Sequence, residues 1–211
     1  MRKLITFVLF AFGMNVAFAA SYQEAMIENI EKMNKTQNPA ELVEIANAFD
    51  RIALKETSEW LPLYYSAYAT TTTLFFSTQP SDEEKARTLD KAQQKIDEAM
   101  KIAANESEMY ILQAMVYQMR ISGDMNTAYQ YTQKIAEVLA RAEKLNPQNP
   151  RIPYLRGTTL FYTPAQYGGG PSAAKPLLEK AAKLFSTADT SNALMPNWGA
   201  YHNNMVLQQC Q

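Results

Sequence analysis

The sequence predicts an all-α protein of about nine helices, arranged as antiparallel hairpins. In almost every segment, apolar residues recur at the spacing of one helix face. Most of these segments also begin with a capping residue or with a proline that suits a first helical turn. No run alternates apolar and polar residues with a period of two, so no strand is expected.

Residues 1–19 are expected to be a secretory signal peptide. Arg2 and Lys3 precede an apolar run that ends near residue 18, and Ala17 and Ala19 supply the small-x-small cleavage pattern. The run is too short for a convincing membrane span, and no later segment approaches that length. We therefore expect cleavage after Ala19 and an exported product, most simply in the periplasm of a Gram-negative bacterium.

Residues 20–57 are expected to form an N-terminal pair of helices. Ser21 and Glu24 match a capping box at the start of the first helix. Asn38 caps the second helix, and Pro39 takes its first position. The expected buried stripes are Met26, Ile27, Ile30 and Met33 on the first helix, and Leu42, Ile45, Phe49 and Ile52 on the second.

Six helices are expected between residues 58 and 185. The third begins near Ser58 and ends near Phe76, and the fourth opens at Ser81 and runs for about 22 residues. The fifth follows Asn105 and ends at the glycine of Ser122-Gly123. The sixth carries apolar residues from Ala128 to Leu145 and stops at Asn146-Pro147. The seventh starts with Asn149-Pro150 and runs to about Tyr162, and the eighth runs from Pro171 or Ser172 to about Phe185.

Residues 186–211 are expected to form a polar linker and a C-terminal capping helix. This ninth helix begins near Pro196 and carries Trp198, Tyr201, His202 and Met205 on one side.

Three consecutive glycines, Gly168, Gly169 and Gly170, separate the seventh and eighth helices. A phosphate-binding loop requires a preceding strand and a Lys-Ser/Thr pair, and this segment has neither. Glycine permits positive φ, and Pro171 suits a first helical position. We therefore expect a hairpin turn here.

Small residues recur where hairpin helices would cross closely. Ala99, Ala142 and Ala181 stand near the ends of the fourth, sixth and eighth helices, at spacings of 43 and 39 residues. Ala114 and Gly157 occupy the preceding helices and are expected to face them. A fixed period of this length indicates stacked helical hairpins.

The repeat resembles the tetratricopeptide repeat family over residues 58–185. Segments similar to the first-helix signature of that family are Trp60-x-x-Leu63, Tyr110-x-x-Gln113-Ala114-x-x-Tyr117 and Arg156-Gly157-x-x-Leu160. The resemblance implies three hairpins in a short α-solenoid, with second helices longer than the ~34-residue repeat allows. The glycine turn and residues 194–199 are also similar to uncharacterised exported repeat proteins of Gram-negative bacteria.

The resemblance implies that side chains of the first helices line a concave surface. Tyrosine and methionine side chains suit recognition of a partner at that surface. The alternative is that these side chains, which recur at helical spacing, pack between repeats. The candidate partner-binding residues are Tyr64, Tyr65, Tyr68, Met115, Gln118, Met119, Tyr154, Thr158, Phe161 and Tyr162.

Composition limits the other classes of function. Without the signal peptide, 18 basic and 21 acidic residues remain and no dense basic stripe is present, so a nucleic-acid partner is not expected. Cys210 is the only cysteine, so neither an internal disulfide nor a cysteine-based metal site can form. His202 is the only histidine and is expected to pack rather than to act in catalysis. Neither a catalytic constellation nor a cofactor or metal motif is visible.

The sequence thus favours a non-enzymatic exported scaffold that binds a protein or peptide. The alternative is a periplasmic repeat subunit that binds a small molecule beside a transporter. An apolar, enclosed concavity of several hundred Å³ would favour the small molecule, whereas an open groove or flat patch would favour a protein.

Overall fold

The computed structural model describes residues 21–121 and 124–210. These residues form nine α-helices and one short 3-10 helix, with no strand among them, which confirms the predicted fold class. The expected signal peptide and the Ser122-Gly123 helix end lie outside the described residues. Within those residues, no helix combines the length and the apolar character that crossing a membrane requires.

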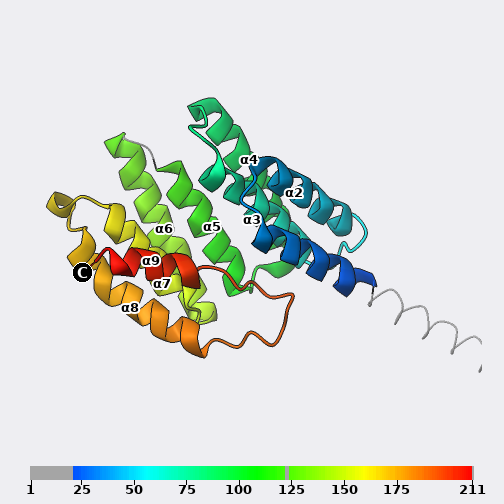
Figure 1. Cartoon of the computed structure of the whole chain (residues 1–211). Coiled ribbons are helices and arrows are strands. Elements are labelled where there is room, and N and C mark those ends of the chain that lie inside the picture. Colours follow the sequence, from blue (N-terminus) through cyan, green and yellow to red (C-terminus); the bar gives the residue numbers. More distant parts are fainter. Residues whose placement is uncertain (1–20, 122–123, 211) are drawn as a thin grey trace, which may run out of the picture.

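The helices follow one another in a simple order (Figure 1). A helix over residues 21–35 comes first, followed by α2 (Pro39–Ala53), α3 (Leu61–Phe76), α4 (Asp82–Ala103), α5 (Ser107–Arg120), α6 (Met125–Leu145), α7 (Arg151–Tyr162), the 3-10 helix η1 (Ala165–Tyr167), α8 (Pro171–Thr187) and α9 (Ala200–Gln208).

The helices form an inner and an outer layer. Consecutive helices pack together from α2 to α9, and α5 also contacts both α3 and α7. Eleven of the 16 residues of α3 are buried, against three of the 21 residues of α6. A helix that is apolar on most sides belongs inside, and an amphipathic one outside. Helices α3, α5 and α7 are therefore the inner layer, covered by α4, α6 and α8.

Local capping explains several helix starts. The Asn38 side chain accepts a hydrogen bond from the Ala40 N–H at 2.9 Å, and the Ser81 hydroxyl accepts one from the Glu84 N–H at 3.2 Å. These bonds satisfy N–H groups that have no partner inside the helix. The predicted starts of α2 and α4 are confirmed.

The chain after α8 differs from the expectation. Helix α9 begins at Ala200 rather than near Pro196, because residues 188–199 are irregular and Gly199 adopts φ +102°. We refer to residues 188–199 as the C-terminal strap. Trp198 consequently lies on this strap and not on the last helix.

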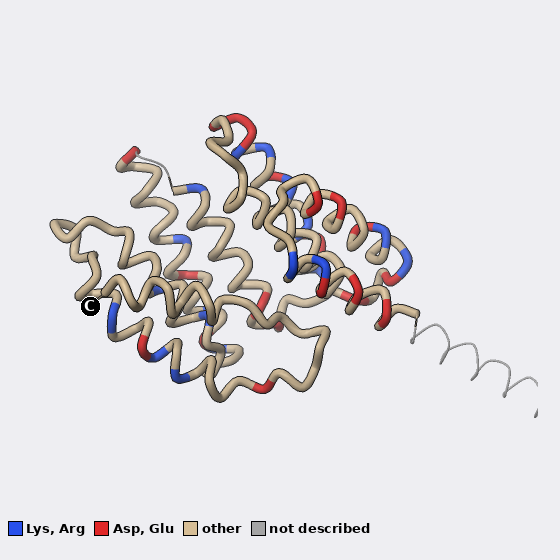
Figure 2. The backbone as a smooth tube through the Cα atoms, in the orientation of Figure 1, with Lys and Arg blue, Asp and Glu red and all other residues tan. Residues whose placement is uncertain are grey.

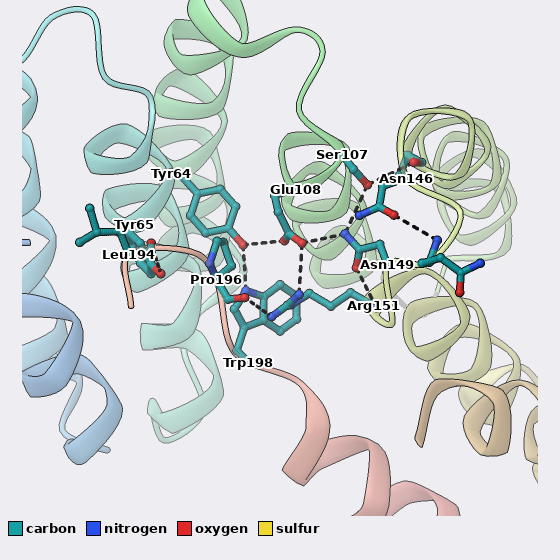
Figure 3. A network of polar contacts seen from close by, with 12 residues as sticks. Tyr64, Tyr65, Ser107, Glu108, Asn146, Asn149, Arg151, Leu194, Pro196 and Trp198 are labelled. Carbon is teal, nitrogen blue, oxygen red and sulfur yellow. Dashed lines mark hydrogen bonds and ion pairs between the residues drawn. The ribbon is translucent and has the colours of Figure 1, made fainter. Parts of the chain in front are cut away.

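A buried polar network holds the strap to the inner layer (Figure 3). The Arg151 guanidinium of α7 lies 3.1 Å from the Glu108 carboxylate of α5 and also donates to the Pro196 carbonyl of the strap. The Asn149 amide donates to the same carboxylate at 2.7 Å. Burial raises the pKa of the Glu108 carboxyl, while Arg151 and Asn149 act in the opposite direction.

Two tyrosines of α3 complete the attachment. The Trp198 indole N–H donates to the Tyr64 hydroxyl at 2.8 Å, and the Tyr65 hydroxyl donates to the Leu194 carbonyl at 2.9 Å. Arg151 also lies over the Trp198 ring, 5.1 Å from its centroid. Helices α3, α5 and α7 thus meet the strap at one buried point.

Removing the cation of this network should strongly destabilise the fold. Arg151→Leu leaves the Glu108 carboxyl buried without its counter-charge, and we expect a loss of about 3–5 kcal/mol in the free energy of unfolding. Urea denaturation followed by circular dichroism measures this loss. Arg87→Leu is the matched control, since Arg87 pairs with Glu83 on the exposed surface of α4 and should change stability little. Equal effects of the two variants would contradict a structural role for the buried pair.

The small residues expected at helix crossings are all buried. Ala99, Ala114, Ala142 and Ala181 are fully buried, and Gly157 is buried in α7. A Cβ at Gly157 would lie 2.7 Å from Cδ2 and 2.9 Å from Cγ of Leu178 in α8, closer than side chains tolerate. Helices α7 and α8 can approach this closely only because position 157 has no side chain.

Gly157→Ala is therefore expected to destabilise the protein by about 1–3 kcal/mol, as overpacking does. In a helix without such a contact, the same change would add up to about 1 kcal/mol of stability. Gly168→Asn serves as the control, since position 168 has φ +82°, which asparagine tolerates, and no atom near its Cβ position. A rise in the urea midpoint of Gly157→Ala would refute the close approach.

The glycine segment forms a compact turn between α7 and α8. The N–H groups of Gly168, Gly169 and Gly170 donate to the carbonyls of Ala165, Pro164 and Leu160 respectively. Backbone donors used in this way are not free to bind a phosphate.

Candidate functional site

A cavity of about 780 Å³ opens between the C-terminal half of α5, the start of α6 and the C-terminal part of α7. Phe75 of α3, the loop that holds η1 and one residue of α9 complete its wall. We refer to this cavity as the groove. Its lining residues are Phe75, Met115, Gln118, Met119, Ile121, Met125, Ala128, Tyr129, Thr132, Tyr154, Thr158, Thr159, Tyr162, Thr163, Pro164, Tyr167 and His202.

The groove has a buried floor and an exposed apolar rim. Met115, Tyr154 and Thr158 are each less than 10% exposed. Five large rim side chains are each more than half exposed: Phe75, Met125, Tyr129, Tyr162 and Tyr167. Exposed apolar side chains grouped around a concave site are a common sign of ligand binding.

Among the residues that the structure describes, no charged side chain lines the groove. Residues 157–174 and 190–211 contain no Asp, Glu, Lys or Arg, and these two segments supply much of one wall. In Figure 2, charged residues are frequent along α2 and α4 and absent from the loop around η1 and from α9. A ligand in the groove therefore meets uncharged walls.

The polar atoms of the lining largely bond to the protein itself. The hydroxyls of Thr132, Thr159 and Thr163 each donate to a carbonyl of the preceding helical turn at 2.8 Å. The Gln118 amide nitrogen donates to the Leu155 carbonyl at 2.9 Å and to the Thr159 hydroxyl at 2.8 Å. These bonds leave a predominantly apolar surface with aromatic faces and thioether groups.

Tyr154 and His202 form a hydrogen-bonded pair in the wall. The Tyr154 hydroxyl and His202 Nδ1 lie 2.9 Å apart, and the two rings meet edge to face with centroids 5.8 Å apart. Burial raises the pKa of the Tyr154 phenol above its ordinary value and lowers the pKa of the His202 imidazole. Both side chains are therefore neutral near pH 7.

Six of the ten candidate residues from the sequence lie in this groove. They come from the two inner helices α5 and α7: Met115, Gln118, Met119, Tyr154, Thr158 and Tyr162.

The other four candidates lie elsewhere. Tyr64 and Tyr65 are almost completely buried, and both hydroxyls bond within the protein, which corrects the expectation that one of them faces an open surface. Tyr68 stacks on Trp198 with ring centroids 5.1 Å apart. Phe161 is partly buried and packs against the hydrophobic cluster shared by α5 to α9. The strap covers the three tyrosines of α3, and no pattern in the sequence predicts that contact.

Several lining residues were not expected from the sequence. Met125, Tyr129 and Thr132 come from α6, an outer helix, and Tyr167 and His202 come from the C-terminal segments. One signal was present: Met125, Tyr129 and Thr132 stand at i, i+4 and i+7, which is a second face of α6 beside its buried stripe.

Metal-binding side chains are sparse. Among the described residues, no group of three or more His, Cys, Asp or Glu side chains is placed to hold a metal ion. Cys210 is buried near the C-terminal end of α9, and its thiol donates to the Val206 carbonyl.

Comparison with known proteins shows which solved structure this fold is similar to. No protein-family model matches the chain, and no curated protein matches it. Among solved structures, the HusA haemophore from Porphyromonas gingivalis matches with a TM-score of 0.79 and 30% sequence identity. The match covers 90% of this chain and 92% of that chain.

Proposed function

The chain belongs to the family of the HusA haemophore, and from this premise we propose that it is an exported, non-enzymatic protein that binds haem or a related planar tetrapyrrole in the groove. The observation that carries the proposal is the uncharged groove of about 780 Å³, rimmed by aromatic side chains, on a fold shared with a haemophore.

The size and the chemistry of the groove suit a flat, largely apolar ligand. Its volume lies within the range of about 300–1,000 Å³ that is usual for small-molecule sites. Tyrosine rings can stack on the face of a macrocycle, and methionine side chains adapt to its outline. Tyr129, Tyr162, Met115 and Met119 offer such contacts from both walls and the floor.

The same groove constrains how a tetrapyrrole would lie. Haem carries two carboxylates at one edge, and an unpaired buried charge is costly. Because the described residues of the lining include no cation, these carboxylates are expected at the open rim, in contact with water. The apolar part of the macrocycle then occupies the floor.

The groove favours a small molecule over the protein or peptide partner that the sequence suggested first. It is concave and predominantly apolar, and its size is that of a small-molecule site. Binding of a protein partner and association with a transporter stay predictions from the sequence.

Titration of the purified protein with ferric haem tests the proposal. We expect saturable binding at micromolar concentrations or below, seen as a shifted Soret absorbance band and as quenching of tryptophan fluorescence, since Trp198 lies beside Tyr154 of the groove wall. Absence of both signals up to the solubility limit of haem would refute the function.

Removing two rim tyrosines should weaken binding without unfolding the protein. Tyr129 and Tyr162 are each 69% exposed, so the Tyr129→Ala/Tyr162→Ala double variant should keep its melting temperature. An aromatic contact is worth about 1 kcal/mol or more, so the double variant should bind haem about 10- to 100-fold more weakly. Tyr201→Ala is the matched control, since Tyr201 is 80% exposed and lies outside the lining. Unchanged affinity of the double variant would place the ligand elsewhere.

A further inference from the structure

The outer layer carries an excess of positive charge over α6 and α8. Six basic side chains lie there: Arg141 and Lys144 on α6, Lys175, Lys180 and Lys183 on α8, and Arg156, which extends from α7. We refer to these six residues as the basic face. Two carboxylates, Glu143 and Glu179, stand among them, whereas Lys134 and Glu137 balance each other earlier on α6. In Figure 2, blue segments recur along α8 with little red between them.

Side-chain contacts join the two outer helices into one surface. The Arg156 guanidinium donates to the Glu143 carboxylate of α6 at 2.8 Å. This bond lowers the pKa of the Glu143 carboxyl, and the nearby Lys180 of α8 acts in the same direction. The C-terminal halves of α6 and α8 therefore present their cations side by side.

The cations of the basic face are largely without neutralising partners. Within the described part of the chain, Arg156 is the one member of the six that forms an ion pair. Residues 21–106 instead contain 15 acidic and nine basic residues. Four of those cations pair with carboxylates, namely Lys32, Lys35, Arg87 and Lys95. The positive potential of the molecule is thus concentrated over α6 and α8, although the chain as a whole is slightly acidic.

Helix dipoles do not account for this charge. A cation in the last turn of a helix is stabilised by the dipole, and Lys144 occupies such a position in α6. The last turn of α8 contains no basic residue, and Lys175 stands near the N-terminal end of that helix, where the dipole offers a cation no stabilisation. The lysines of α8 therefore suit an anion outside the protein better than they suit the helix itself.

The chemistry of the basic face fits a lipid surface better than a protein. Contact regions between proteins are enriched in aromatic side chains and contain little lysine. The large apolar side chains of α8 and of residues 130–145 are all at least partly buried, so the basic face offers no apolar anchor. Clusters of flexible lysines attract the phosphates of anionic lipid headgroups without a preformed pocket.

We propose that the basic face binds the surface of a lipid bilayer through the phosphate groups of anionic phospholipids. Such binding is peripheral, because the lysine and arginine heads contact the headgroups while the folded helices stay outside the hydrocarbon. The six residues are not part of the groove lining, so lipid binding and ligand binding use different side chains. The inference does not depend on the proposed function.

Co-sedimentation with lipid vesicles tests the inference. The protein, purified in its exported form, is mixed with vesicles of phosphatidylcholine alone or of phosphatidylcholine and phosphatidylglycerol in equal parts. We expect binding only to the vesicles that contain phosphatidylglycerol, at about 0.1 M salt, where attraction between charges extends over about 10 Å. The bound protein should be released at about 1 M salt, where that distance falls to about 3 Å.

The test variant reverses three charges of the basic face: Lys144→Glu/Lys180→Glu/Lys183→Glu. These side chains are exposed, so the melting temperature should change little. Each cation near an anionic surface strengthens binding roughly fivefold, so the variant should bind these vesicles about 100-fold or more weakly.

The matched control is Lys55→Glu/Lys91→Glu/Lys101→Glu. It changes the net charge by the same amount, also at exposed positions, but on α4 and after α2. Its affinity for the vesicles should stay within about fivefold of the wild type, because screening confines the attraction to nearby charges.

Three results would overturn the inference. The first is equal binding of the wild type to both kinds of vesicle, or to neither. The second is an equal loss of affinity in the test variant and the control, since binding would then follow net charge and not the basic face. The third is stronger binding to soluble polyglutamate than to the vesicles at equal concentration of negative charge, which would assign the face to an acidic protein. Haem binding is measured separately on the same samples, so either proposal can fail alone.

Discussion

The buried ion pair between Glu108 and Arg151 is the contact on which the rest of the molecule depends. Taking both charges out of water is costly, and close pairing with further hydrogen bonds offsets that cost. Here the carboxylate also accepts from Asn149, and the guanidinium also donates to the strap and lies over Trp198, while its Nε has no partner among the described residues. A buried pair of this kind is satisfied in few alternative packings of the helices, so it specifies one arrangement of α5, α7 and the strap.

The shape of the groove depends on this arrangement of α5, α7 and the strap. Trp198 is held by Tyr64 and Arg151, stacks on Tyr68 and meets the edge of Tyr154. Tyr154 in turn orients His202, which α9 brings back to the inner layer. A chain of packed rings thus connects the buried charges to the wall of the groove. The C-terminal segment is therefore part of the site, although it lies outside the repeated hairpins.

The sequence predicted the helices well because their signals are local. Capping at Asn38 and Ser81 and the period of the apolar residues fixed most helix starts, and the small side chains at Ala114 and Gly157 marked buried positions. The site was predicted only in part. Met115 and Tyr154 could be placed from the resemblance to stacked hairpins, whereas Tyr64 and Tyr65 are covered by a strap some 130 residues later in the chain. Contacts between segments so far apart in the chain do not change the spacing of apolar residues in either segment, so that spacing cannot predict them. The position of His202 in the groove could not be predicted for the same reason, because its hydrogen-bond partner Tyr154 lies on another helix.

The lack of charge in the groove has a consequence for how firmly a ligand is held in different surroundings. Ions in solution weaken attraction between exposed charges, over a distance of about 8 Å at physiological ionic strength. Contacts between apolar surfaces contain no such attraction, and the lining residues that the structure describes supply no charge that could be screened. Retention of a ligand there should therefore vary little between dilute and saline media, and the protein could keep its cargo where salt concentration changes.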